Sequence, residues 1–224
     1  GVPADPESKS TGAAAGLTEI ESRDGRPEDA PVAALLIREA GDRLMDFLAG
    51  FRGRAATEEV LEGLWNLPGT RFSREHARVA LTDGEPAGIL VGYPREAMAG
   101  LDFGTGRALL GLRGLALAAG VLRHPVLTWR MSTLPEAEPG DWYVCVLATR
   151  EAFRGRGIGA ALLADAESRA RRHGAAALSL MVSEGNAPAR SLYAKFGFEE
   201  RGRFTVAGRT SQRMGKRLEM LEPR

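Results

Sequence analysis

The sequence predicts an α/β protein with a mixed sheet, because strand-like and helix-like segments alternate along its second half. The alternating segments are two apolar runs, each followed by a helical pattern: 142–147, 158–172, 176–182 and 188–196. A second observation is an antiparallel hairpin at 76–91, where Asp83-Gly84 marks a tight turn between alternating strands. The helix at 158–172 has arginines near its end and Gly174 as a stop signal, which supports its assignment.

Shorter patterns predict the remaining elements. Residues 17–23 fit a first strand, although their alternation is poor. Pro27 followed by two acidic residues is typical of a helix start, and Thr57 fits the N-cap of a further helix. The apolar residues expected to form one buried helical face are Val32, Leu35, Leu36, Leu44 and Leu48. Two strands, at 198–206 and 210–218, are predicted to end the sheet.

Composition and charge narrow the possible functions. Residues 1–16 are rich in Gly, Pro, Ser and Ala and are predicted to be a disordered tail, whereas 17–224 can form one domain whose core needs no metal or disulfide. The formal net charge of +1 gives no overall basic field for nucleic acid. The single cysteine, Cys145, fits a reducing compartment. No stretch resembles a signal peptide, and charged residues interrupt the apolar segment 108–127. We therefore expect a cytoplasmic protein with no membrane span.

The most informative stretch is a glycine-rich loop between the apolar run 143–149 and the helix that follows. It reads Arg154-Gly155-Arg156-Gly157-Ile158-Gly159. Glycines let the backbone approach a ligand closely, and a helix start adds unpaired N–H donors and the positive end of the helix dipole. Arg150, Arg154 and Arg156 add positive charge. The loop therefore predicts a binding site for a phosphorylated ligand.

Other interpretations of this loop are weaker. A P-loop requires Lys and then Ser or Thr after its last glycine, but Gly159 is followed by Ala160-Ala161. A dinucleotide-binding fingerprint fits Gly155-x-Gly157-x-x-Ala160 only formally, because residues 150–154 separate the strand from the first glycine. A glycine-rich turn without a ligand is the remaining alternative. No metal is expected, since the three histidines lack the spacing of metal ligands.

Two motifs together carry a family resemblance. The first is Arg154-x-x-Gly157-x-Gly159, and the second is the run from Asn186 to Phe198, which reads NAPARSLYAKFGF. In this order, with a helix and a strand between them, they resemble the GNAT-type N-acetyltransferases. The resemblance is specific over about a quarter of the chain, 144–198. It implies a mixed, mostly antiparallel central sheet flanked by helices, and acetyl-CoA as the acyl donor.

The resemblance also implies where the donor binds. In this family the central strand diverges from its neighbour and pairs with the pantetheine arm, here through Val146, Leu147, Ala148 and Thr149. The pyrophosphate would lie on the N–H groups of the glycine loop. The residues of that loop are Arg154, Gly155, Arg156, Gly157, Ile158, Gly159 and Ala160. Asn186 would bond the amide arm or simply cap its helix, and Lys195 would meet the ribose phosphate or remain solvated.

Catalytic roles follow from the same resemblance. The expected reaction is direct attack of an amine on the thioester, without a covalent enzyme intermediate. Tyr193 would protonate the leaving thiolate, and the backbone N–H of Leu147 would stabilise the oxyanion. Asp141, at the start of the central strand, is the candidate base, with a surface role as its alternative. Core packing is the alternative for Tyr193.

The acceptor side is less defined. Residues 95–140 depart from the family pattern and are predicted to be a mostly helical insertion, broken near His124-Pro125, that contributes either to the acceptor site or to packing and a dimer contact. The resemblance implies that the acceptor is an amine of a small molecule, a peptide or a protein, and that the chain can form a homodimer. Arginines in the last hairpin hint at an anionic acceptor group, although such charges usually form a solvated face. Two other functions remain open: an acyl-CoA sensor on the same fold, and a nucleotide-dependent oxidoreductase, which the loop spacing disfavours.

Overall fold

A computed structural model describes residues 20–41, 43–50, 53–114, 134–206 and 208–219. Within these residues one seven-stranded sheet has the order β1-β2-β3-β4-β5-β7-β6. Neighbouring strands are antiparallel except β4 and β5, which are parallel. The strands are β1 (Ile20–Asp24), β2 (Ala77–Thr82), β3 (Glu85–Pro94), β4 (Asp141–Thr149), β5 (Ala177–Ser183), β6 (Glu199–Val206) and β7 (Arg209–Arg217). The mixed, mostly antiparallel sheet predicted from the sequence is therefore confirmed.

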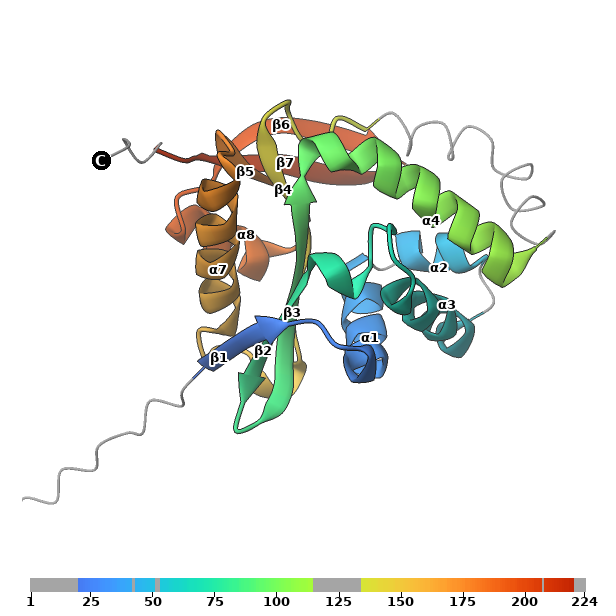
Figure 1. Ribbon diagram of the computed structural model, residues 1–224. Helices are drawn as coiled ribbons and strands as arrows, with labels where there is room; N and C mark the ends of the chain where they lie inside the picture. Colours follow the sequence, from blue (N-terminus) through green and yellow to red (C-terminus); the bar gives the residue numbers. More distant parts are fainter. Residues whose placement is uncertain (1–19, 42, 51–52, 115–133, 207, 220–224) are drawn as a thin grey trace, which may run out of the picture.

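Helices cover both faces of the sheet (Figure 1). Four of them pack on one face: α1 (Ala30–Gly41), α2 (Arg43–Ala49), α3 (Arg54–Asn66) and α4 (Met98–Arg113). Two pack on the other: α7 (Ile158–His173) and α8 (Ala187–Lys195). Short 3-10 turns precede several elements: η1 (Pro27–Asp29), η2 (Arg74–His76), η3 (Arg95–Ala97) and η4 (Glu151–Phe153). None of the described helices is long and apolar enough to cross a membrane.

Each face of the sheet has its own apolar core. Under α1 and α3, the fully buried side chains include Leu36, Leu64 and Trp65, which pack with Ile89 of β3. Under α7, Leu162 packs in a core with residues of the central strands. Burial of each such side chain contributes about 1.5–3 kcal/mol to folding. Helices α7 and α8 are thus anchored on one face of the sheet, and the N-terminal helices on the opposite face.

The N-terminal helices differ in detail from the sequence prediction. The buried face of α1 consists of Ala30, Ala33, Ala34, Leu36 and Ile37. Of the predicted residues whose side chains the structure describes, Leu36 is fully buried, and Val32, Leu35 and Leu44 are partly buried. α3 begins at Arg54, one turn before the predicted cap, and Thr57 lies inside the helix. Its hydroxyl donates to Asp46 Oδ1 at 3.0 Å and to Gly53 O at 3.1 Å, because a threonine inside a helix bonds backward to the preceding turn.

The segment between β3 and β4 contributes α4 to the face that carries α1 and α3. The predicted break near His124-Pro125 lies outside the described residues, as does the predicted tail 1–16. The chain then re-enters the described structure at Leu134 and reaches β4 through the loop 134–140.

Candidate functional site

The central feature of the site is the divergence of β4 from β5. These strands pair only from Asp141 opposite Ala177 to Val144 opposite Leu180. Beyond that point β4 continues to Thr149 along β3, while β5 continues to Ser183 along β7. The second half of β4 therefore has a strand partner on one side only, and its other edge can pair with an extended ligand.

The backbone groups at this edge can be identified from the ladder. Arg150 N donates to Ala87 O at 2.9 Å, and Thr149 lies opposite Gly88. Residues of an antiparallel ladder alternate between bonding their partner strand and pointing away from it. Of the four predicted pantetheine-pairing residues, Leu147 and Thr149 therefore point their N–H and C=O groups away from β3, toward the side that β5 has left. Val146 and Ala148 face β3.

A β-bulge marks the place where the strands separate. Val91 lies opposite Val146, but the next residue of β3, Gly92, lies opposite Val144, so Cys145 has no partner in β3. The bulge shifts the alternation of β4: Tyr143 and Val146 belong to the core under α1, whereas Leu147 belongs to the core under α7. Strict alternation in the sequence gives no sign of this extra residue.

The glycine loop joins the end of β4 to α7. Gly155 and Gly157 have φ of 76° and 83°, a left-handed conformation that glycine adopts without strain, and Gly157 occupies the N-cap position of α7. Among the described residues, none accepts a hydrogen bond from the N–H groups between Gly155 and Ala160. The 16-residue helix directs the positive end of its dipole at the same place. The loop is therefore suited to bind a diphosphate.

Two of the three arginines at the loop lie against one aromatic ring. The guanidinium carbons of Arg150 and Arg156 lie 5.2 and 5.4 Å from the ring centre of Phe153. Arg150 also donates to Pro86 O, and Arg154 lies 3.9 Å from Glu39 in a solvent-exposed ion pair. Such exposed pairs are weak, so these side chains keep their charge available to an anion.

Helix α8 places the second motif beside the first. Asn186 caps this helix, its side-chain oxygen accepting from Ala189 N at 3.2 Å, and Lys195 is exposed. Tyr193 is buried, its ring centre lies 5.7 Å from that of Phe198, and burial raises the pKa of its hydroxyl to about 12. No described residue forms a hydrogen bond with that hydroxyl. A protonated phenol without a protein partner is suited to donate a proton to a ligand.

Asp141 is occupied by the turn that precedes β4. Its Oδ2 accepts from Glu138 N at 2.9 Å, and its own N–H donates to Glu138 O. Asp141 also lines a cavity of about 10 Å³ with Ser179 and Arg213, whose hydroxyl and Nε atoms are buried without protein partners. A cavity of this size and polarity is suited to one water molecule. The role of Asp141 as a base stays a prediction, and its evident structural role is to cap this turn.

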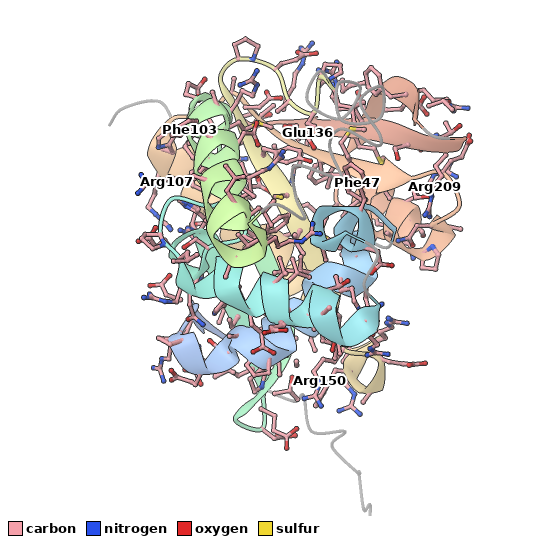
Figure 2. All side chains as sticks on the ribbon, turned by 90° about the vertical axis from the view of Figure 1, so that its right-hand side faces the viewer. Phe47, Phe103, Arg107, Glu136, Arg150 and Arg209 are labelled. Carbon is pink, nitrogen blue, oxygen red and sulfur yellow. The ribbon has the colours of Figure 1, made fainter. Side chains whose placement is uncertain are left out.

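A polar network that the sequence analysis did not identify lies on the opposite face from α7. Arg71 donates to Tyr93 Oη at 2.9 Å, to Asp102 Oδ1 at 3.1 Å and to Glu136 Oε2 at 2.5 Å. The hydroxyl of Tyr143, on β4, lies 3.3 Å from Glu136 Oε1. Burial raises the pKa of both tyrosines, so each hydroxyl stays protonated at neutral pH. Figure 2 shows Glu136 beside α4, at the opposite end of the molecule from Arg150.

Comparison with known proteins identifies the family. A sequence model of the acetyltransferase (GNAT) family matches residues 42–198. The crystal structure of an acetyltransferase is 26% identical with a TM-score of 0.66, covering 89% of this chain and 100% of that chain. An N-acetyltransferase from Staphylococcus aureus Mu50 is 23% identical with a TM-score of 0.68, covering 87% and 99%. The NatC complex bound to Gag peptide and CoA is 14% identical with a TM-score of 0.51, covering 90% and 99%. No curated protein sequence matches the chain. The match to the family model extends over most of the chain, which therefore belongs to the acetyltransferase (GNAT) family.

Proposed function

We propose that the protein is an acetyl-CoA-dependent N-acetyltransferase that transfers an acetyl group to an amine of a small molecule or a peptide. The family supports acetyl transfer in general. The observation that carries the proposal is the continuity between the free edge of β4 and the glycine loop, because a donor with an extended amide arm and a diphosphate needs both, in this order.

The donor would run along β4 in the direction opposite to the strand. Its diphosphate accepts hydrogen bonds from the N–H groups between Gly155 and Ala160, with Arg156 nearby. Its amide arm pairs with the outward N–H of Thr149 and the outward C=O of Leu147, because Arg154 Nε already donates to Thr149 O. The thioester then lies near the bulge at Cys145, where β4 rejoins β5.

The chemistry at the thioester requires an oxyanion donor and an acid. The Leu147 N–H, which the ladder directs away from β3, stabilises the oxygen as the amine attacks the carbonyl carbon. When the carbon–sulfur bond breaks, Tyr193 donates its proton to the departing thiolate, and the proton that the attacking nitrogen loses passes to solvent, from which the Tyr193 hydroxyl is restored. Its raised pKa keeps that proton in place until the thiolate forms.

The test begins with thermal unfolding in the presence of acetyl-CoA, CoA and NAD. A ligand at 100 times its dissociation constant stabilises the folded protein by about 2.7 kcal/mol. We expect stabilisation by acetyl-CoA and CoA but not by NAD, followed by amine-dependent thiol release. Binding of acetyl-CoA without release with any amine would instead indicate a sensor. No stabilisation by either CoA compound would refute the donor site.

A further inference from the structure

The Arg71–Glu136 network lies where an acceptor would reach the thioester. Tyr143, which contacts Glu136, is opposite Ser179, one residue pair before β4 and β5 separate. Its side chain belongs to the core under α1, opposite the face covered by the donor-side helices α7 and α8. Since α8 brings Tyr193 to the donor from that face, we place the acceptor on the side of Glu136, which lies beside α4 (Figure 2).

The network carries one net negative charge. Arg71 is shared between two carboxylates, those of Glu136 and Asp102. One positive and two negative charges leave a balance of −1. The side chain of Glu136 is 19% exposed, so solvent and a ligand can reach it. A carboxylate accepts about four hydrogen bonds, and Arg71 and Tyr143 use two, which leaves capacity for a further donor.

Two of the arginines that hinted at an anionic acceptor group, Arg203 and Arg213, are engaged in ion pairs. Arg203 forms ion pairs with Glu184 and Glu200 in the last hairpin. Arg213 pairs with Glu138 at 2.7 Å and donates to Pro135 O. These partners neutralise the two guanidinium groups. The charged group that contacts Tyr143 and keeps free lone pairs is the carboxylate of Glu136.

We propose that Glu136 binds the ammonium group of the acceptor, so that the enzyme takes primary alkylammonium compounds and disfavours amines that carry a carboxylate. This inference rests on the proposed N-acetyltransferase function and names its substrate class. Tyr143 and Arg71 act as positioning residues: both hold the Glu136 carboxylate, and neither needs to touch the substrate. The ammonium binds to the remaining lone pairs of Glu136, and once it has released one proton to solvent the neutral amine attacks the thioester carbonyl carbon.

The test compares Glu136→Gln with the control variant Glu138→Gln, which removes a more exposed glutamate of the same loop from its own arginine pair. Thiol release from acetyl-CoA is measured with n-butylamine, which is charged at neutral pH, and with hydroxylamine, which is neutral. Since a hydrogen bond to a charged group is worth about 1.5–3 kcal/mol, we expect E136Q to raise KM for n-butylamine about 10- to 100-fold. The KM for hydroxylamine and the affinity for acetyl-CoA should change less than about twofold, as should all three values in E138Q.

Equal losses with both nucleophiles would show a merely structural role and overturn the inference, as would an unchanged KM for n-butylamine in E136Q. A wild-type measurement covers the case in which E136Q does not fold: KM for β-alanine should exceed KM for n-butylamine at least about tenfold, and equal values would refute the ammonium site. If acetyl-CoA stabilises the protein but n-butylamine releases no thiol, the ammonium site fails and the donor site stands. If acetyl-CoA does not bind, both the proposed function and this inference are wrong.

Discussion

Gly159 of α7 and Leu192 of α8 approach so closely that a Cβ atom on Gly159 would lie 2.9 Å from Leu192 Cδ2. The last glycine of the loop motif is therefore a packing position as well as part of the predicted diphosphate site. It allows α8 to lie against the first turn of α7, and the next residue of α8 is Tyr193. One small residue thus sets the spacing between the diphosphate loop and the proposed acid.

Gly159→Ala tests this spacing. The added methyl group must displace the end of Leu192, so we expect a loss of about 1 kcal/mol in the free energy of unfolding, measured in urea. Because Tyr193 moves with α8, kcat should fall several-fold while acetyl-CoA affinity changes little. The matched variant is Gly155→Ala, whose Cβ meets no atom within 4 Å but whose φ of 76° strains alanine by about 1 kcal/mol. Equal kcat values in the two variants would contradict a role of Gly159 in placing Tyr193.

Gly157 offers a test of the diphosphate site that separates charge from backbone geometry. Its φ of 83° is a conformation that Asn and Asp adopt more readily than other residues, so Gly157→Asp and Gly157→Asn impose the same strain. Only the aspartate places a negative charge beside the donor's diphosphate. Isothermal titration with CoA should show binding to the Asn variant and a loss of at least about tenfold in affinity on going from Asn to Asp. Equal affinities of the two variants would remove the diphosphate from this loop.

Tyr193→Phe tests the proposed acid, because phenylalanine keeps the ring contact with Phe198 and removes only the hydroxyl. General acid catalysis contributes about 100-fold or more, so kcat should fall by about that factor while the dissociation constant of acetyl-CoA stays within twofold. Unchanged turnover would mean that the thiolate leaves without help from Tyr193.

The raised pKa values of the tyrosines have a direct spectroscopic consequence. The chain has three tyrosines, at positions 93, 143 and 193, and burial raises the pKa of each. At pH 10 the folded protein should show almost no tyrosinate absorbance at 295 nm, whereas the unfolded chain should be about half ionised. The raised pKa values also imply that stability is lost as the pH rises above about 10, where the unfolded chain releases these protons first. Half-ionised tyrosine in the folded protein at pH 10 would contradict this burial.

Much of the region from the glycine loop to α8 could be predicted because its signals are local. Gly157 and Gly174 flank α7, and Asn186 caps α8, so the predicted helices agree with the observed ones to within one or two residues. A cap is set by the conformation and hydrogen bonds of a few neighbouring residues, which the sequence shows directly. The same holds for the hairpin at Asp83-Gly84, where Asp83 has a positive φ of 53°.

The network around Arg71 could not be predicted in this way because its contacts join distant segments. Arg71 and Glu136 are 65 positions apart, and neither belongs to a motif. The bulge at Cys145 depends on the register between β3 and β4, which an alternating pattern in a single strand does not specify. Asp141 was predicted as a base from its place in the strand, but whether its carboxylate is free depends on the turn at Glu138.

Asp29 gives a stability prediction that is independent of ligands. Its carboxylate accepts from both terminal nitrogens of Arg23, at 2.7 and 2.8 Å, and from Arg26 N at 2.7 Å, at the start of the first helical segment. Burial alone would raise its pKa, but these bonds outweigh that effect and lower it. The stabilisation is therefore present above the ordinary carboxyl range and is lost as the pH falls through the lowered pKa.

Asp29→Asn should cost about 3 kcal/mol at pH 7 in urea unfolding, and the difference from wild type should shrink toward pH 3. Glu28→Gln is the control, because its ion pair with Arg26 is long at 3.8 Å and exposed, and should cost at most about 0.5 kcal/mol. A cost of Asp29→Asn that does not change with pH would mean that packing at this position matters more than the charge.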